Sequence, residues 1–167
     1  MNTPLLHTAT CPSPLGPLLL AASPRGLAGA WFQGQKHWPA GAAEWPEDER
    51  HPLLVEAREQ LAAYFDGRLA RFELPLDLAR GTAFQTAVWQ ALLAIPRGQT
   101  QTYAQLAGRL GRPQAARAVG AAVGRNPLSV IVPCHRVLGA AGALTGYAGG
   151  LERKTALLRL EGVALPH

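Results

Sequence analysis

The chain of 167 residues has few charged side chains and only two cysteines, Cys11 and Cys134. Two cysteines exclude a fold held by a disulfide framework and a metal site with four cysteine ligands. Charged residues make up 16% of the chain, below the ~25% of an average soluble protein, and hydrophobic residues make up 48%. This composition excludes a disordered or fibrous chain. The length matches about one domain of ~150 residues and is enough to bury a core.

Long apolar runs are also missing. Runs such as Leu18–Ala22 are far shorter than the about 18 residues that a membrane span needs. The N-terminus lacks the basic start of a signal peptide, because its first positive side chain is Arg25, and Pro12, Pro14 and Pro17 interrupt the residues before it. We therefore expect a cytoplasmic protein with reduced thiols and no membrane partner.

Acidic residues are scarce in the second half of the chain. Residues 1–80 contain seven Lys/Arg and nine Asp/Glu, a formal charge of −2, whereas residues 81–167 contain nine Lys/Arg and two Asp/Glu, a formal charge of +7. Such an imbalance is typical of surfaces that bind phosphates, with a solvated basic face as the alternative. The change in charge also predicts two domains, residues 1–80 and 81–167.

The first domain is predicted to contain a small sheet and one helix. Two short apolar runs, Leu18–Ala22 and Leu27–Phe32, flank a turn sequence and predict a β-hairpin. A segment with apolar side chains at helical spacing begins at Pro52 and ends at Gly67. Residues 33–50 are predicted to form a loop between them.

The second domain is predicted to be mostly helical. Thr82 and Thr102 each begin a capping box, in which the threonine and the glutamine three residues later bind each other's backbone. A further helix is predicted from Pro113 to Gly124, after a glycine turn. Two short helices joined in this way predict a helix-turn-helix.

Residues 114–123 of this helix are almost all small, and Arg117 is the only charged one. Small side chains allow a helix backbone to come close to whatever it faces. Two interpretations remain open. The helix packs tightly on a neighbour with Arg117 in solvent, or it approaches a partner with Arg117 in the contact.

The β-branched run at residues 128–132 predicts a short strand that ends at Pro133-Cys134-His135-Arg136. A lone cysteine is usually a buried, inert residue. The neighbouring Arg136 instead favours the thiolate, which is the nucleophilic form. Adjacent strand residues point to opposite faces, so His135 could serve as a base for Cys134 only through a turn or a bridging water.

Glu161 stands in the last turn of a helix predicted over residues 151–161. A carboxylate at this place opposes the helix dipole and costs about 0.3–1 kcal/mol when exposed. A histidine or arginine partner would explain Glu161, and a solvated surface glutamate is the alternative. A cysteine hydrolase could use Cys134, His135 and Asn126, but the adjacent Cys-His-Arg matches no protease signature.

The motifs around Cys134 resemble those of one family. Arg117-Ala-Val-Gly, Asn126-Pro, Ile131-Val-Pro-Cys-His-Arg-Val137, Gly146-Tyr-Ala-Gly-Gly150 and Leu157-Leu-Arg-Leu-Glu-Gly162 are similar to motifs of the methylated-DNA–protein-cysteine methyltransferases, or O6-alkylguanine-DNA alkyltransferases. The resemblance is strong over residues 82–162. The first half of the chain matches the family only in its size and general character. It implies an α/β (α+β) fold with an N-terminal ribonuclease-H-like domain of sheet and helix and a C-terminal helical, winged-helix-like DNA-binding domain.

The resemblance also implies an activity. This family repairs O6-alkylguanine in duplex DNA, and to varying extents O4-alkylthymine, by base flipping and irreversible alkyl transfer to its own cysteine. We therefore expect a single-turnover methyltransferase that binds double-stranded DNA as a monomer, without a cofactor or a metal ion. Some relatives bind a structural zinc ion, but Cys11 and the nearby histidines lack ligand spacing here. A non-catalytic protein that senses alkylated DNA, with a structural Cys134, is the alternative.

The resemblance assigns catalytic roles position by position. Cys134 would accept the alkyl group, and His135 would take the thiol proton through a water. Glu161 would hold His135 in the required tautomer. Asn126 would bind the backbone across the turn that holds the active-site segment.

The resemblance also assigns contacts with DNA. Arg117 would fill the gap left by the flipped base, and Tyr103 would press on the phosphate beside the lesion. The pocket around the flipped base would be lined by Val123, Val137, Tyr147 and Ala148.

Overall fold

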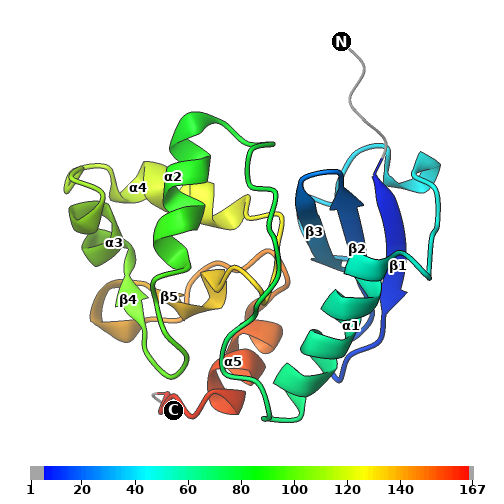
Figure 1. Cartoon of the computed structure of the whole chain (residues 1–167). Helices are drawn as coiled ribbons and strands as arrows, with labels where there is room; N and C mark the ends of the chain where they lie inside the picture. The colour runs from blue at the N-terminus through cyan, green and yellow to red at the C-terminus, as the bar shows by residue number, and fades with distance from the viewer. Residues whose placement is uncertain (1–5, 166–167) are drawn as a thin grey trace.

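The computed structural model describes residues 6–165 and consists of two parts that pack side by side (Figure 1). The first part holds a three-stranded antiparallel sheet in the order β1-β2-β3. Its strands are β1 (His7–Cys11), β2 (Leu18–Ser23) and β3 (Gly26–Phe32). The predicted hairpin of β2 and β3 is confirmed. Strand β1 pairs with β2 along its length and was not predicted, because its five residues carry no apolar alternation.

The predicted helix is confirmed as α1 (Pro52–Phe65), and it lies against the sheet (Figure 1). The ring of His51 accepts a hydrogen bond from the backbone of Leu53 and caps the helix, and Pro52 occupies the first turn. The buried side chains of α1 are spaced so that they share one face. They are Leu54, Ala57, Leu61 and Tyr64.

The second part is helical and lies on the other side of the chain segment that follows α1 (Figure 1). Both predicted capping boxes are confirmed, at Thr82 and Thr102. The helix-turn-helix consists of α3 and α4, and α4 begins at Ala116 rather than at Pro113, since residues 113 and 114 form a turn. The elements are α2 (Ala83–Leu92), β4 (Gln101–Thr102), α3 (Tyr103–Arg109), α4 (Ala116–Gly124), η2 (Cys134–Arg136), β5 (Val137–Leu138), η3 (Ala140–Gly142) and α5 (Leu151–Leu160), with a further short turn, η1 (Ala42–Glu44), in the first part.

The strand predicted at residues 128–132 is wrong. Leu128 forms one isolated bridge with Ala30 of β3, and the residues after it turn back. The backbone N–H of Val132 donates to the carbonyl of Leu128 at 2.9 Å, which closes the turn. Val130 lies at φ 73° within it, a conformation that β-branched residues rarely adopt. Apolar β-branched residues are therefore used here for burial and not for sheet pairing.

One apolar core runs through both parts. It joins side chains of the sheet and α1 to those of α2, α4 and α5, among them Leu61, Val88, Val119 and Leu157. Each fully buried side chain of this size contributes about 1.5–3 kcal/mol from removal of apolar surface from water. The shared core therefore holds the second part against the first.

None of the helices described over residues 6–165 is long and apolar enough to cross a membrane.

Candidate active site

Asn126 shapes the segment that carries Cys134. Its side-chain amide donates to the carbonyl of Val132 at 2.8 Å and to that of Leu128 at 3.3 Å, and its oxygen accepts from the N–H of Leu128 at 2.9 Å. These bonds hold both ends of the turn together. Cys134 follows the turn as the first residue of η2, not as the end of a strand. Asn126 therefore stabilises the turned backbone that places Cys134.

His135 and Glu161 meet in the interior. The His135 side chain is 0% exposed, and its Nε2 lies 2.8 Å from Oε2 of Glu161. Arg136 donates to the two carboxylate oxygens from Nε and Nη2, at 2.8 Å each, and the hydroxyl of Tyr64 donates to Oε2. The sequence predicted a histidine or an arginine as the partner of Glu161, and the carboxylate binds one of each, His135 and Arg136. Nδ1 of His135 is buried and has no hydrogen-bond partner among residues 6–165.

The electrostatics of this pair define the histidine tautomer. Burial alone would raise the pKa of Glu161, but the hydrogen bonds from His135 and Arg136 outweigh burial and hold that pKa far below its usual range. Burial lowers the pKa of His135, although Glu161 acts in the opposite direction. A neutral imidazole that donates from Nε2 to a carboxylate carries its lone pair on Nδ1. His135 is thus poised to accept a proton at Nδ1.

Cys134 is 6% exposed, and burial raises the pKa of its thiol. Asn126 and Lys154 act in the opposite direction without cancelling this effect. The prediction that Arg136 favours the thiolate is wrong, because its guanidinium is bound to Glu161 and to the carbonyl of Ile95 at 2.6 Å. Cys134 is therefore held as a thiol, and its proton has to be removed during the reaction.

Lys154 is a buried cation that the sequence analysis missed. Its Nζ donates to the carbonyls of Thr145 at 2.8 Å and Gly146 at 3.1 Å, and so ties α5 to the loop before it. On its helix it looks like a surface residue between Arg153 and Thr155. The sequence carries no signal that marks Lys154 as buried, because the other lysine, Lys36, is exposed.

We expect the substitution Lys154→Met to change how stability depends on pH. Burial lowers the pKa of Lys154 from 10.5 to about 8, so between these values the unfolded chain binds more protons than the folded chain. The contribution of Lys154 to stability therefore rises with pH in this window. Urea unfolding at about pH 7 and about pH 9.5 would show the wild type gaining stability relative to the variant at the higher pH. A substitution of the exposed Arg159 on the same helix serves as a control. If the stability difference between the wild type and Lys154→Met did not change with pH, the expectation would be contradicted.

A cavity of about 170 Å³ opens at Cys134. Four of the predicted residues line it together with Cys134, namely Tyr103, Val123, Tyr147 and Ala148. The remaining lining residues, which the sequence analysis did not assign, are Lys36, His37, Gly120, Gly124 and Gly146.

The predicted pocket role of Val137 is not supported. Val137 is buried in β5, where it pairs with Gln101, and it is not among the residues that line the cavity. Its neighbour in the sequence motif, Cys134, is on the cavity wall because η2 turns the chain between them.

The helix α4 presents small residues beside this cavity. Gly120 and Gly124 line it, and Arg117 lies three and seven residues before them, on the same helical face. Arg117 is exposed. The hydroxyl of Tyr103 donates to the carbonyl of Thr145 at 3.2 Å. Tyr103 therefore lines the cavity, and Arg117 is exposed on the face of α4 that carries Gly120 and Gly124.

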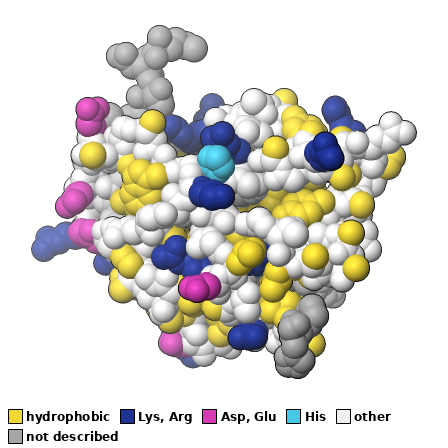
Figure 2. Space-filling model, turned by 180° about the vertical axis from the view of Figure 1, so that it is seen from behind, with side chains coloured by type: hydrophobic (Ala, Val, Ile, Leu, Met, Phe, Trp, Pro, Cys, Tyr) yellow, Lys and Arg dark blue, Asp and Glu magenta, His cyan; other side chains and the backbone are white. Residues whose placement is uncertain are grey.

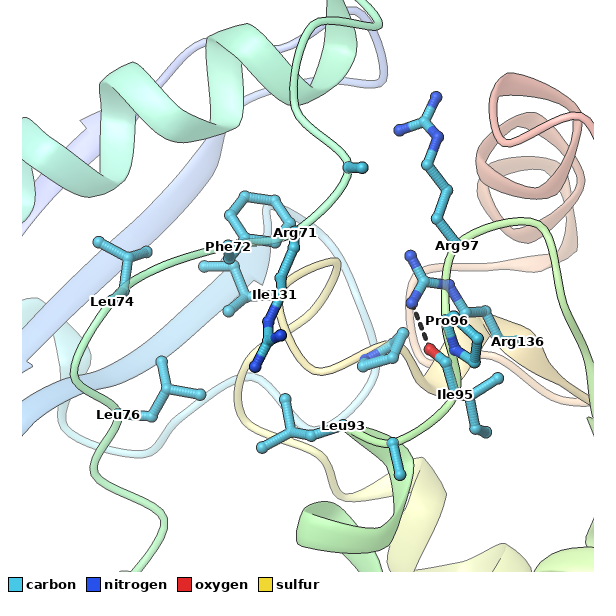
Figure 3. Close-up of a pocket in the computed structure, with 13 residues that line it drawn as sticks. Arg71, Phe72, Leu74, Leu76, Leu93, Ile95, Pro96, Arg97, Ile131 and Arg136 are labelled. Carbon is cyan, nitrogen blue, oxygen red and sulfur yellow. Dashed lines mark hydrogen bonds between the residues drawn. The ribbon is translucent and has the colours of Figure 1, made fainter.

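A second, larger crevice of about 680 Å³ reaches the active-site segment through Ile131, Pro133 and Arg136, and does not include Cys134. Figure 3 shows the Arg71 side chain extending into it and Arg136 bound to the carbonyl of Ile95. Its other walls are the chain before α2 and the loop after it. No three His, Cys, Asp or Glu side chains within residues 6–165 gather in a way that could hold a metal ion.

Two family models match the chain. Residues 6–78 match the 6-O-methylguanine DNA methyltransferase, ribonuclease-like domain, and residues 83–163 match the 6-O-methylguanine DNA methyltransferase, DNA binding domain. The methylated-DNA–protein-cysteine methyltransferase of Mycobacterium tuberculosis is 49% identical over 94% of this chain and 93% of its own length. The protein of that name from Methanosarcina acetivorans is 48% identical over 94% of this chain and 99% of its own length.

Solved structures agree with these matches. The crystal structure of the M. tuberculosis O6-methylguanine methyltransferase superposes with a TM-score of 0.85 at 48% identity, covering 94% of this chain and 93% of that one. The M. tuberculosis OGT in complex with DNA gives a TM-score of 0.84 at 49% identity, covering 93% and 92%. Fold and site together define a two-domain DNA-repair methyltransferase. The chain belongs to the O6-methylguanine DNA methyltransferase family.

Proposed function

We propose that Cys134 is the residue of this methyltransferase that accepts the methyl group of O6-methylguanine in duplex DNA. The observation that carries the proposal is the position of the thiol on the wall of a small cavity, next to a neutral, buried histidine with a free Nδ1. A flipped guanine would occupy the cavity, because the target carbon is not accessible in a stacked duplex. The reaction needs no redox partner.

The transfer step balances with the residues present. The bond between Sγ and the methyl carbon forms as the bond between that carbon and guanine O6 breaks. The leaving guanine keeps the electron pair and takes up a proton from the hydroxyl of Tyr103, which lines the cavity and is reprotonated through water from His135. The thiol proton passes to Nδ1 of His135, directly or through one water, and Glu161 stabilises the imidazolium that forms. A stable thioether remains on Cys134. Each molecule is therefore used once.

Glu161 and Asn126 act through other residues in this proposal. Glu161 keeps the proton of His135 on Nε2 and offsets its charge during transfer. Asn126 holds the turn that presents Cys134 to the cavity. Val123, Tyr147 and Ala148 enclose the flipped base.

The helix α4 supplies the contact with DNA in our proposal. Its small residues allow the backbone to lie close in the minor groove, and sequence-independent recognition suits a search for lesions. Arg117 would fill the place of the flipped base, and Tyr103 would contact the phosphate beside it. The protein would act as a monomer on duplex DNA that carries O6-alkylguanine. We place it in the cytoplasm and its domain boundary near residue 80. The relative solved with DNA supports this partner.

Mass spectrometry of the protein after incubation with duplex containing O6-methylguanine tests the proposal. We expect the peptide that contains Cys134 to gain one methylene in mass, with saturation at one per protein. A protein that binds the lesion without any mass change would be a sensor of alkylated DNA. Multiple turnovers would indicate a hydrolase instead.

We expect Arg117→Ala to slow transfer from duplex DNA far more than transfer from the free base O6-methylguanine. Flipping costs a few kcal/mol, and loss of a group that offsets part of this cost lowers the duplex rate about 10- to 100-fold. Single-turnover rates on both substrates measure the effect. The exposed Arg159 on α5, changed to alanine, controls for the loss of one charge. Equal losses on both substrates would rule out the proposed role of Arg117.

A further inference from the structure

Two residues of the first part of the chain stand at the active-site cavity. Lys36 and His37 follow strand β3 and line the cavity together with Cys134. Both side chains are exposed, so they stand at its mouth. No residue of this half of the chain was predicted from the sequence to take part in catalysis or DNA binding, and nothing in the proposed transfer step uses Lys36 or His37.

The segment that carries them is fixed to the cavity wall at Ala148 and to the turn that precedes Cys134. The backbone N–H of Lys36 donates to the carbonyl of Ala148 at 2.9 Å. Gln35 is 7% exposed, and its side-chain oxygen accepts from the N–H of Phe32 at 2.8 Å and from the hydroxyl of Ser129 at 3.3 Å. Ser129 belongs to the turn that precedes Cys134. A buried, satisfied polar side chain of this kind specifies one position for the residues next to it.

Positive charges gather at the same place. Arg125 directly follows Gly124, which lines the cavity together with Lys36 and His37. Partial burial, followed by the charges of Arg125 and Lys36, lowers the pKa of His37. None of the three forms an ion pair with a carboxylate in the described part of the chain, residues 6–165. Figure 2 shows Lys and Arg side chains around a histidine near the middle of the face seen from behind. Clustered cations without acidic partners favour an anionic ligand.

The proposed function indicates which anion this is. In that proposal the cavity of about 170 Å³ holds the flipped base, and the attached sugar and phosphates continue to the DNA backbone outside it. When a nucleotide is flipped from DNA lying on α4, its backbone has to remain at the mouth. Lys36 and His37 stand there on the wall that the first part contributes, and Arg125 follows the last turn of α4.

We propose that Lys36, His37 and Arg125 form a phosphate site that binds the phosphodiester of the flipped nucleotide. This inference rests on the proposed function. It gives the first part of the chain a direct role, since its residues would hold the extruded nucleotide while Cys134 reacts. A free base lacks the phosphodiester and would gain nothing from the site.

The test combines Lys36→Ala with His37→Asn, because asparagine tolerates the positive φ of 59° at position 37. We expect the double variant to lose about tenfold in transfer rate and affinity with duplex containing O6-methylguanine, as for loss of hydrogen bonds to a charged group. Its rate with the free base O6-methylguanine should stay unchanged. The slope of log affinity against log salt concentration should decrease by about one, because Lys36 is the one cation that the double variant removes.

Arg25→Ala is the matched control, since Arg25 is an exposed cation in the turn between β2 and β3 that does not line the cavity. A double variant that behaves like this control would overturn the phosphate site. An equal loss with the free base would overturn it as well, because the two residues would then act on the base and not on its phosphodiester. If the wild type transfers no methyl group from any substrate, the proposed function fails, and the affinity and salt slope still decide the phosphate site.

Discussion

Cys134→Ser is expected to abolish methyl transfer while DNA affinity stays within about twofold of the wild type. A serine hydroxyl is a far weaker nucleophile at neutral pH than a thiol whose proton can pass to a histidine, and a fall of at least about 10⁴-fold follows. The change is nearly isosteric, so the turn held by Asn126 should persist. Single-turnover assays with labelled duplex and fluorescence anisotropy on the same DNA measure the two quantities separately.

Cys11→Ser provides the matched control. Cys11 is also buried, at 1% exposure, but it lies in β1 and does not line the cavity. We expect this variant to transfer the methyl group at the wild-type rate, with some loss of stability from a buried hydroxyl. Methyl transfer by Cys134→Ser, or its loss in Cys11→Ser, would place the acceptor elsewhere.

Glu161→Gln is expected to lower both stability and transfer rate. Arg136 is buried, and the neutral amide would leave its guanidinium without a counter-charge, a loss of about 3–5 kcal/mol in the free energy of unfolding. The rate should fall about 100-fold, because the amide cannot offset the charge on His135 or enforce its tautomer. Urea unfolding and single-turnover transfer at a temperature where the variant is folded measure the two effects.

The pH dependence supplies a second readout for Glu161. Its folded-state pKa lies far below the unfolded value of about 4.5, so its stabilisation is fully present above that value and is lost as the pH falls towards the folded-state pKa. The stability difference between the wild type and Glu161→Gln should therefore shrink on acidification. Glu152→Gln, at an exposed carboxylate in the first turn of the same helix, should show neither effect. A variant of full stability with unchanged rate would remove Glu161 from the mechanism.

Local patterns predicted much of this molecule correctly. The capping boxes at Thr82 and Thr102 and the hairpin of β2 and β3 depend on residues within a few positions of one another, and all are present. The prediction of a strand at residues 128–132 was wrong, and the cause is also a local interaction. The amide of Asn126 binds the backbone of Leu128 and Val132, and this outweighs the β-propensity of the valines and isoleucine.

The sequence motifs alone identified the family and the cysteine, because Pro-Cys-His-Arg with its upstream and downstream spacings is specific. They did not determine the charge state of the site. Arg136 lies two residues after Cys134 in the chain, yet it binds Glu161, 25 residues away, and the thiol is neutral because it is buried. The protonation of Cys134 depends on desolvation and on the partners that folding brings near it. The identity of its neighbours in the sequence predicts neither.

Only the tertiary structure decided which distant residues complete the site. Tyr64 reaches Glu161 across 97 positions, and Lys36 and His37 reach the cavity from the other half of the chain. No periodicity or capping pattern marks such residues, since their positions follow from how the sheet packs against the helices. The sequence by itself therefore determined the chemistry of the nucleophile and the local turns. The packing of the two halves determined the tautomer of His135, the neutral thiol and the walls of the pocket, because each of these depends on burial and on contacts distant in the chain.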